Sequence, residues 1–165
     1  MIKIGLGKAL GFSLLAFIGL NFLFIIIVYT ISGDLNLLFS AISSEPLIII
    51  SVFFGPIGFM PGYVITLLTG QIYSGVFDAS LIQWIGFIVS PFVASLVAGR
   101  TGDGKGGSFG GWMIAALIGS AALSVLAFIQ LADPLMTIVV LILSGVVNGI
   151  FYGCFALLFS KSEMY

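Results

Sequence analysis

The chain has 165 residues, of which 61% are hydrophobic and 7% are charged. Soluble domains carry about 45–50% apolar and about 25% charged residues, so the composition excludes an ordinary soluble fold and predicts a single integral membrane domain over residues 1–165. The absence of histidine, a lone Cys154 and a net charge of −1 argue against an intrachain disulfide, a zinc or haem site, and a nucleic-acid partner.

The first apolar run extends from Ala9 to Ser32. A bilayer core of about 30 Å needs roughly 20 helical residues, so this run is long enough to cross it. Lys3 and Lys8 precede the run as in a secretory signal. The run is too long for such a signal and no small-residue cleavage site follows, so we expect a retained span. Asn21 lies near mid-span, where an amide either clamps a second helix or contacts a solute.

The second apolar run, from Leu47 to Gly70, contains Pro56 and Pro61 together with three glycines near its centre. Proline removes a helix donor and clashes with the preceding turn, so a broken helix is predicted. Three arrangements remain open for this segment. Leu47–Phe54 and Ile57–Gly70 form a re-entrant hairpin between four spans, or Leu35–Phe54 and Ile57–Ile72 each cross to give six spans, or the run crosses once to give five.

Basic residues bear on this choice, because cytoplasmic loops collect Lys and Arg. A single crossing divides the five basic residues three against two, whereas a re-entrant or double crossing leaves all five on one side. We favour the second outcome, which predicts a multi-pass cell-membrane protein with both termini in the cytoplasm. The six-span version also buries Glu45, at a cost of roughly 2.5–3.5 kcal/mol. The basic residues are Lys3, Lys8, Arg100, Lys105 and Lys161.

Three further runs of spanning length complete an all-α polytopic transmembrane bundle with four to six spans. They are Leu81–Gly99, Gly111–Leu131 and Leu135–Ser160. Each carries small residues at every fourth position, which line one helix face and let another backbone approach closely. We interpret these faces as internal packing, with docking onto another membrane subunit as the alternative. The small residues are Ser90, Ala94, Ala98, Gly111, Ala115, Gly119, Gly145, Gly149 and Gly153.

Several polar and aromatic side chains mark positions along these runs. Trp84 and Trp112 lie close to run ends and are predicted to anchor the helices at the membrane interface. Gln83 and Gln130 also lie near run ends. Asn148 lies nearer mid-span, so it either clamps another helix or contacts a solute.

A nucleotide-binding pattern occurs between the apolar runs Leu81–Gly99 and Gly111–Leu131. Gly99, Gly104 and Lys105 reproduce G-x-x-x-x-G-K, but Gly106 stands where a Ser or Thr should hold magnesium. The preceding element is a membrane helix rather than a buried strand. We therefore reject nucleotide binding and predict that Thr101–Ser108 is a flexible hairpin.

The chemistry available within the apolar runs is limited. They contain no acidic or basic side chain, which disfavours ion-coupled transport. No nucleophile with a base and no set of metal ligands can be assembled from them. The sequence therefore predicts a protein that is not an enzyme and has no cofactor.

One segment resembles a known family. Phe54-Gly55-Pro56-Ile57-Gly58, then Gly62 and the helix Ile85–Gly99, are similar to the membrane-embedded S components of energy-coupling-factor vitamin transporters. Those proteins are small, hydrophobic and about six-helical, with both termini in the cytoplasm. The resemblance covers roughly Leu35 to Gly99. It implies a subunit that binds a small solute near the outer helix ends and associates with other membrane subunits.

The chain departs from that family at two points. The small-residue docking motif of the first helix is only approximated, by Gly7 and Gly11. An acidic residue often ends the family's third helix, where this chain has Gln71, with Asp78 further on.

The solute-binding residues that the resemblance implies are Glu45, Tyr63, Tyr73, Asp78, Gln83 and Trp84. The leading hypothesis is a solute-binding membrane subunit of a transporter, and the alternative is a structural or assembly subunit of a larger membrane complex. A solute binder needs a cavity beside Pro56 and Pro61, whereas a scaffold should pack that region solid.

Overall fold

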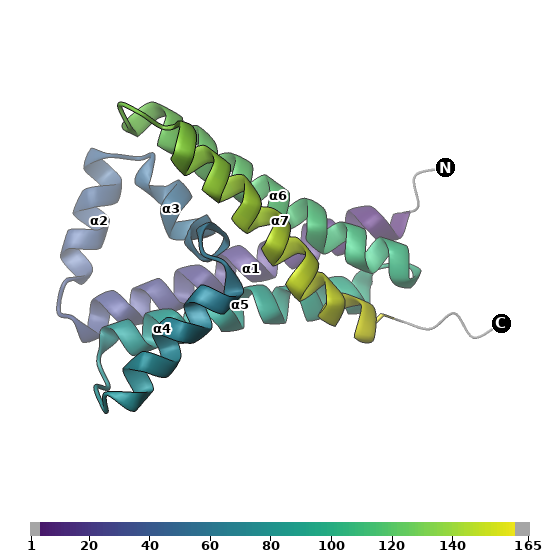
Figure 1. Cartoon of the computed structure of the whole chain (residues 1–165), viewed down its shortest axis with the longest axis horizontal. Coiled ribbons are helices and arrows are strands. Elements are labelled where there is room, and N and C mark those ends of the chain that lie inside the picture. The colour runs from purple at the N-terminus through teal and green to yellow at the C-terminus, as the bar shows by residue number, and fades with distance from the viewer. Residues whose placement is uncertain (1–3, 161–165) are drawn as a thin grey trace.

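The computed structural model describes residues 4–160, and these residues form an all-α bundle that contains no strand (Figure 1). The all-α prediction is confirmed. Lys3 and Lys161, two of the basic residues used to predict the topology, lie outside the described residues. The helices are α1 (Ile4–Ile31), α2 (Leu35–Ser44), α3 (Ile48–Phe54), the 3-10 helix η1 (Gly55–Gly58), α4 (Pro61–Tyr73), α5 (Ala79–Thr101), α6 (Gly104–Gln130) and α7 (Leu135–Leu158).

Four helices, α1, α5, α6 and α7, are long and apolar enough to cross a membrane. The segment formed by α3 with η1 and by α4 passes the same test only as a pair, bent by 89° at its break. Figure 1 shows that α3 enters from the end where α1 stops and that α4 returns to that end, where α5 begins. The two arms of the broken run therefore enter and leave at the same end of the bundle, as the re-entrant arrangement requires.

The six-span alternative is wrong because Leu35–Phe54 is not one helix. It divides into α2, of 10 residues, and α3, of 7 residues, at Glu45 and Pro46. Ten helical residues cover about 15 Å, half of a bilayer core. The sharp return from α1 into α2 is made by Gly33, whose positive φ of 77° suits a residue without a side chain. The Asp34 amide then donates to the Tyr29 carbonyl at 2.9 Å.

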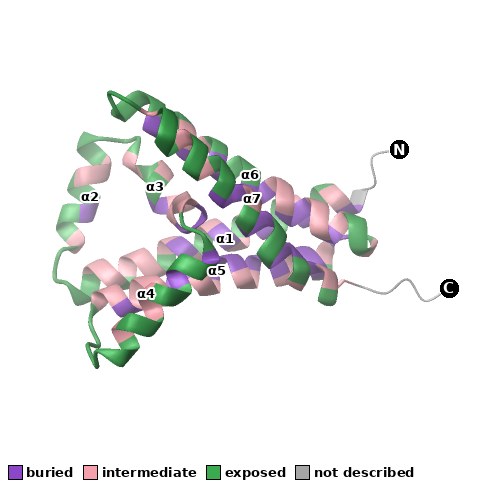
Figure 2. Cartoon of the chain, viewed as in Figure 1, coloured by how far each residue is buried: buried purple, intermediate pink, exposed green. Residues whose placement is uncertain are grey.

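The bundle is tightly packed at one end and splayed at the other (Figure 2). In α1, the buried residues are spaced every fourth position and stop at mid-helix: Gly5, Ala9, Ser13, Phe17 and Asn21. In α7, which starts at Leu135, the first buried residue is Ser144. We call residues 4–21, 90–119 and 144–160 the closed half and the remaining described residues the open half. The hairpin of α3, η1 and α4 lies in the open half, between helices that have diverged.

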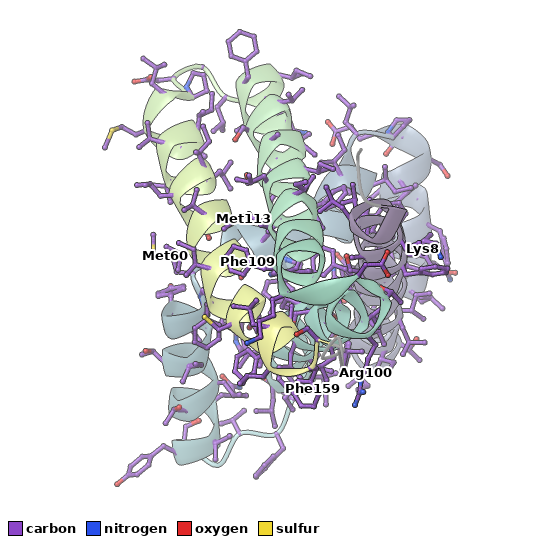
Figure 3. The ribbon with its side chains drawn as sticks, turned by 90° about the vertical axis from the view of Figure 1, so that its right-hand side faces the viewer. Lys8, Met60, Arg100, Phe109, Met113 and Phe159 are labelled. Carbon is purple, nitrogen blue, oxygen red and sulfur yellow. The ribbon has the colours of Figure 1, made fainter. Side chains whose placement is uncertain are left out.

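Small residues hold the closed half together. A Cβ built at Gly99 would lie 2.7 Å from the Ala156 carbonyl oxygen, so α5 and α7 approach with their backbones nearly in contact. On α7, a Cβ at Gly149 would meet Met113 and one at Gly153 would meet Phe109 at 2.6 Å, and Figure 3 shows both of these α6 side chains against α7. All nine small residues that the spacing singles out are buried by neighbours within this chain.

Trp112 is a core residue, and the prediction that it anchors the helix at the membrane interface is wrong. Its side chain is fully buried, its Nε1 donates to the Asn148 carbonyl at 3.2 Å, and its ring meets Phe17 edge-on at 6.0 Å. The reason is that α6 starts at Gly104, seven residues before the expected Gly111. Trp112 therefore lies inside the helix and not at its end.

The predicted flexible hairpin at Thr101–Ser108 is wrong for the same reason. Only Gly102 and Asp103 separate α5 from α6. Ser108 is buried and its hydroxyl donates to the Gly99 carbonyl at 3.2 Å, which ties the first turns of α6 to the end of α5.

The described basic residues all lie at one end of the bundle, together with Asp103, and the other described acids lie at the opposite end. Lys8, Arg100 and Lys105 lie at the closed end, where Figure 3 labels the first two. The Arg100 guanidinium lies 5.9 Å from the centre of the Phe159 ring, within cation–π range. The connections at the open end carry acids instead, namely Asp34, Glu45, Asp78 and Asp133.

Candidate functional site

The re-entrant hairpin breaks at two prolines that each release a backbone carbonyl. In a continuous helix, the carbonyl of residue i accepts from the amide of residue i+4. Pro56 and Pro61 have no amide hydrogen, so the carbonyls of Val52 and Ile57 lose their helical partners. Because lipid offers no hydrogen bonds, these groups must be satisfied from within the protein.

Asn21 of α1 satisfies the first of these carbonyls. Its Nδ2 donates to Val52 at 2.6 Å and to Phe53 at 3.3 Å. The side chain is fully buried. Asn21 therefore fixes the end of α3 to the middle of the first span.

Asn148 of α7 performs the same task at the second break. Its Nδ2 lies 3.3 Å from the Ile57 carbonyl and 2.9 Å from that of Phe59, and it also reaches the Ser144 carbonyl of its own helix. Both asparagines are thus interhelical clamps, one of the two roles expected for amides at mid-span. Together they hold the tip of the hairpin between α1 and α7.

A cavity of about 350 Å³ opens beside this tip in the open half. It lies between the C-terminal part of α1, the short helix α2, α3 with η1, and the first turns of α5. None of its twelve lining residues is charged, and most are apolar. They are Ile25, Val28, Tyr29, Leu38, Ala41, Ile48, Ser51, Val52, Gly55, Phe59, Gln83 and Phe87.

An aromatic cluster forms the wall of the cavity next to α4. The Phe59 ring stacks on the Tyr63 ring, meets the Trp84 ring edge-on and packs against the Phe87 ring. The distances between ring centroids are 6.2, 5.9 and 5.5 Å, respectively. Because Phe59 and Phe87 both line the cavity, this cluster connects the cavity to the base of α4. Such aromatic groups supply large apolar contact area with few rotatable bonds.

The structure brings together three of the six residues that the resemblance implied. Gln83 lines the cavity, and Tyr63 and Trp84 lie behind it around Phe59. Trp84 is half-buried in this cluster, in the second turn of α5.

The other three lie elsewhere. Glu45 directly follows the last residue of α2 and borders a separate depression that also contains Gln130. Tyr73 is 94% exposed. Asp78 caps α5, accepting from the Ser80 amide at 2.9 Å, and also accepts from Gln71 Nε2 at 3.0 Å. Its carboxylate thus has a structural role at the start of the helix.

Gln83 is the one residue among the twelve that line the cavity that was expected at the site from the sequence. Tyr29, Ser51 and Phe87 come from α1, α3 and α5, and Phe59 comes from the link between η1 and α4. Nothing in their local spacing distinguishes these residues from lipid-facing ones. A signal was available for the clamps, because the carbonyls released by prolines at 56 and 61 require donors from elsewhere and two asparagines lie at mid-span.

The fold and the site define a small multi-pass membrane protein with a proline-broken helical hairpin beside an uncharged cavity. Within residues 4–160, no group of three or more His, Cys, Asp or Glu residues is placed to hold a metal ion. Comparison with protein-family models, with curated proteins and with solved structures gave no match.

Proposed function

We propose that this protein is a membrane-embedded, non-enzymatic binding protein for a small neutral solute, which it takes from the side of the membrane that the open half faces. The observation that carries the proposal is the cavity beside Gly55 and Phe59, at the break of the re-entrant hairpin. Its volume of about 350 Å³ falls within the range of about 300–1,000 Å³ typical of small-molecule sites.

The lining supports a neutral solute. A charged ligand in a site without a counter-charge would lose its hydration without compensation, at a cost of several kcal/mol or more. The acids of the open end, such as Glu45 and Asp78, do not line the cavity. Selectivity for uncharged solutes follows from this arrangement.

The same cavity favours solute binding over the assembly-subunit alternative. A scaffold should fill the region around the hairpin break with side chains. Pro56 and Ile57 are buried and packed, but Gly55 and Phe59 on either side of them border open volume.

The resemblance to S components extends the proposal to a partner and an orientation. We propose that the chain serves as the solute-binding subunit of a transporter, with Lys8, Arg100 and Lys105 on the cytoplasmic side. Gly7 and Gly11 are exposed on α1 at that end, and a Cβ at either would meet nothing within 4 Å. This leaves room for a helix of another subunit to approach.

The test is solute binding to the full-length protein in lipid nanodiscs, measured by fluorine NMR with para-fluorotoluene and para-fluorophenol and with empty nanodiscs as reference. Ala41→Phe should fill the cavity from α2 and weaken binding at least tenfold. Ser40→Phe is the matched control, because Ser40 is adjacent and exposed. Absence of binding by both solutes, or equal binding by the two variants, would contradict the proposal.

A further inference from the structure

The lining of the cavity changes character with depth. Tyr29 lies two residues before the end of α1 and Gln83 lies four residues after the start of α5, so both line the outer part of the cavity. Ile25 precedes Tyr29 by four residues and Phe87 follows Gln83 by four, which places each on the same helix face one turn deeper. The outer end of the cavity thus carries polar side chains, whereas its inner end is apolar.

Tyr29 and Gln83 lie at about the same level on adjacent helices. Helices α1 and α5 run antiparallel, and a Cβ at Gly86 would meet the Phe24 side chain at 2.6 Å, which fixes their register. Toward the open end, Tyr29 is five residues from that contact and Gln83 is three, a rise of about 7.5 Å and about 4.5 Å. One polar group of a solute can therefore reach both side chains.

The fold makes no use of these two polar groups. Within residues 4–160, neither the Tyr29 hydroxyl nor the Gln83 amide has a hydrogen-bond partner, and both side chains are half-buried. The hydroxyl of Ser51, the third polar side chain of the lining, already donates to the Ile48 carbonyl at 2.7 Å. The asparagine of α1 likewise spends its amide hydrogens on the hairpin. Tyr29 and Gln83 are thus the polar groups that the cavity offers to a solute.

Their chemistry specifies what would pair with them. The Gln83 amide donates through its NH2 group and accepts through its oxygen, and the Tyr29 hydroxyl does both through one oxygen. A carboxamide carries the same donor and acceptor, so it can form two parallel hydrogen bonds with the Gln83 amide. It also has no net charge, as a lining without a counter-charge requires.

We infer that the solute is an uncharged carboxamide, whose amide group binds Gln83 and Tyr29 and whose apolar body occupies the inner end of the cavity between Ile25, Val52 and Phe87. Gln83 is then the residue that determines specificity. This inference rests on the proposed function, since it assigns a chemical class to the ligand of the same cavity.

Para-fluorobenzamide and methyl para-fluorobenzoate test the inference, because both carry a carbonyl acceptor on the same ring and only the amide donates. Binding to the full-length protein in nanodiscs is measured by fluorine NMR and referred to uptake by empty nanodiscs, so that partition into lipid cancels. We expect the amide to bind about fivefold more tightly than the ester, the factor that corresponds to one neutral hydrogen bond. Equal or tighter binding of the ester would overturn the inference.

Gln83→Leu should weaken binding of the amide about fivefold and leave binding of para-fluorotoluene unchanged. Tyr29→Phe, which removes only the hydroxyl, should weaken binding of the amide by a smaller factor. Gln130→Leu is the matched control, because Gln130 is exposed and does not line the cavity. Equal binding of the amide by Gln83→Leu and Gln130→Leu would contradict the role of Gln83.

The outcomes separate this inference from the proposed function. If para-fluorotoluene and para-fluorophenol bind but the amide is not preferred over the ester, the cavity is a binding site and the inference is wrong. If none of the four solutes binds, the proposed function itself fails. The comparison of amide with ester uses the native protein, so it decides the inference even if Gln83→Leu does not fold.

Discussion

The two halves of the bundle use the same kinds of residues to different ends. In the closed half, glycines and serines face neighbouring helices, and backbones such as those at Gly99 and Ala156 come nearly into contact. In the open half, the glycines of α4 face outward, and a Cβ at Gly62 or Gly70 would meet nothing within 4 Å. Close approach at one end allows the helices to diverge at the other.

The divergence creates the space that the hairpin occupies and only partly fills. Its two proline breaks need hydrogen-bond donors, and the clamps at Asn21 and Asn148 lie near the boundary between the halves. The tightly packed half thus positions the two amides, and the amides position Val52 and Phe59 in the wall of the cavity.

The largest expected effect concerns which way the halves face. In a background of Cys154→Ala, we expect Lys8→Cys and Asp103→Cys to be protected from a membrane-impermeant thiol reagent on intact cells, and Asp133→Cys to be fully labelled. Labelling of the first two on opposite sides of the membrane would overturn the re-entrant topology.

Loss of a clamp should cost the most stability. Asn148→Leu leaves the Ile57 and Phe59 carbonyls without their donor. We expect the free energy of unfolding in mild detergent to fall by about 2–4 kcal/mol, since each unsatisfied buried carbonyl costs about 1–3 kcal/mol. Gln130→Leu is the control, because Gln130 is exposed; it should change stability by less than about 0.5 kcal/mol. Equal effects would show that Asn148 is not a clamp.

The same substitution should have opposite effects in the two halves. Gly99→Ala forces a methyl group against the Ala156 carbonyl and should destabilise the protein by about 1–3 kcal/mol. Gly70→Ala meets open space in α4 and should stabilise it by about 0.5–1 kcal/mol through helix propensity. Chemical denaturation of both variants measures the difference, and loss of stability in both would remove the distinction between the halves.

The smallest effect separates the two tryptophans. Trp112→Phe removes the hydrogen bond to the Asn148 carbonyl, whereas Trp84, in the open half, makes no side-chain hydrogen bond within the described residues. We expect Trp112→Phe to lower the free energy of unfolding by about 0.5–1.5 kcal/mol more than Trp84→Phe does. The order would be reversed if Trp112 were an interface anchor.

The sequence by itself determined the all-α class, the four spans and the position of the break in the second run. These properties depend on composition and on local rules: run length against bilayer thickness, and proline against helix. The placement of basic residues also favoured an even number of crossings between α1 and α5. In the structure, α5 begins at the end of the bundle where α1 stops, as that number requires. Of the six residues that the resemblance implied, Tyr63, Gln83 and Trp84 lie in or beside the cavity, because they flank the break or begin the next span.

Only the tertiary structure decided which groups meet. The amide of Asn21 binds a carbonyl 31 residues away, and that of Asn148 binds one 91 residues away, so no local pattern reports either contact. Trp112 became a core residue because α6 begins earlier than its apolar run, in a glycine-rich segment that the packing against α1 and α5 makes helical. The cavity likewise depends on how far four spans diverge, which is set by side-chain packing across helices and not by the order of residues along any one of them.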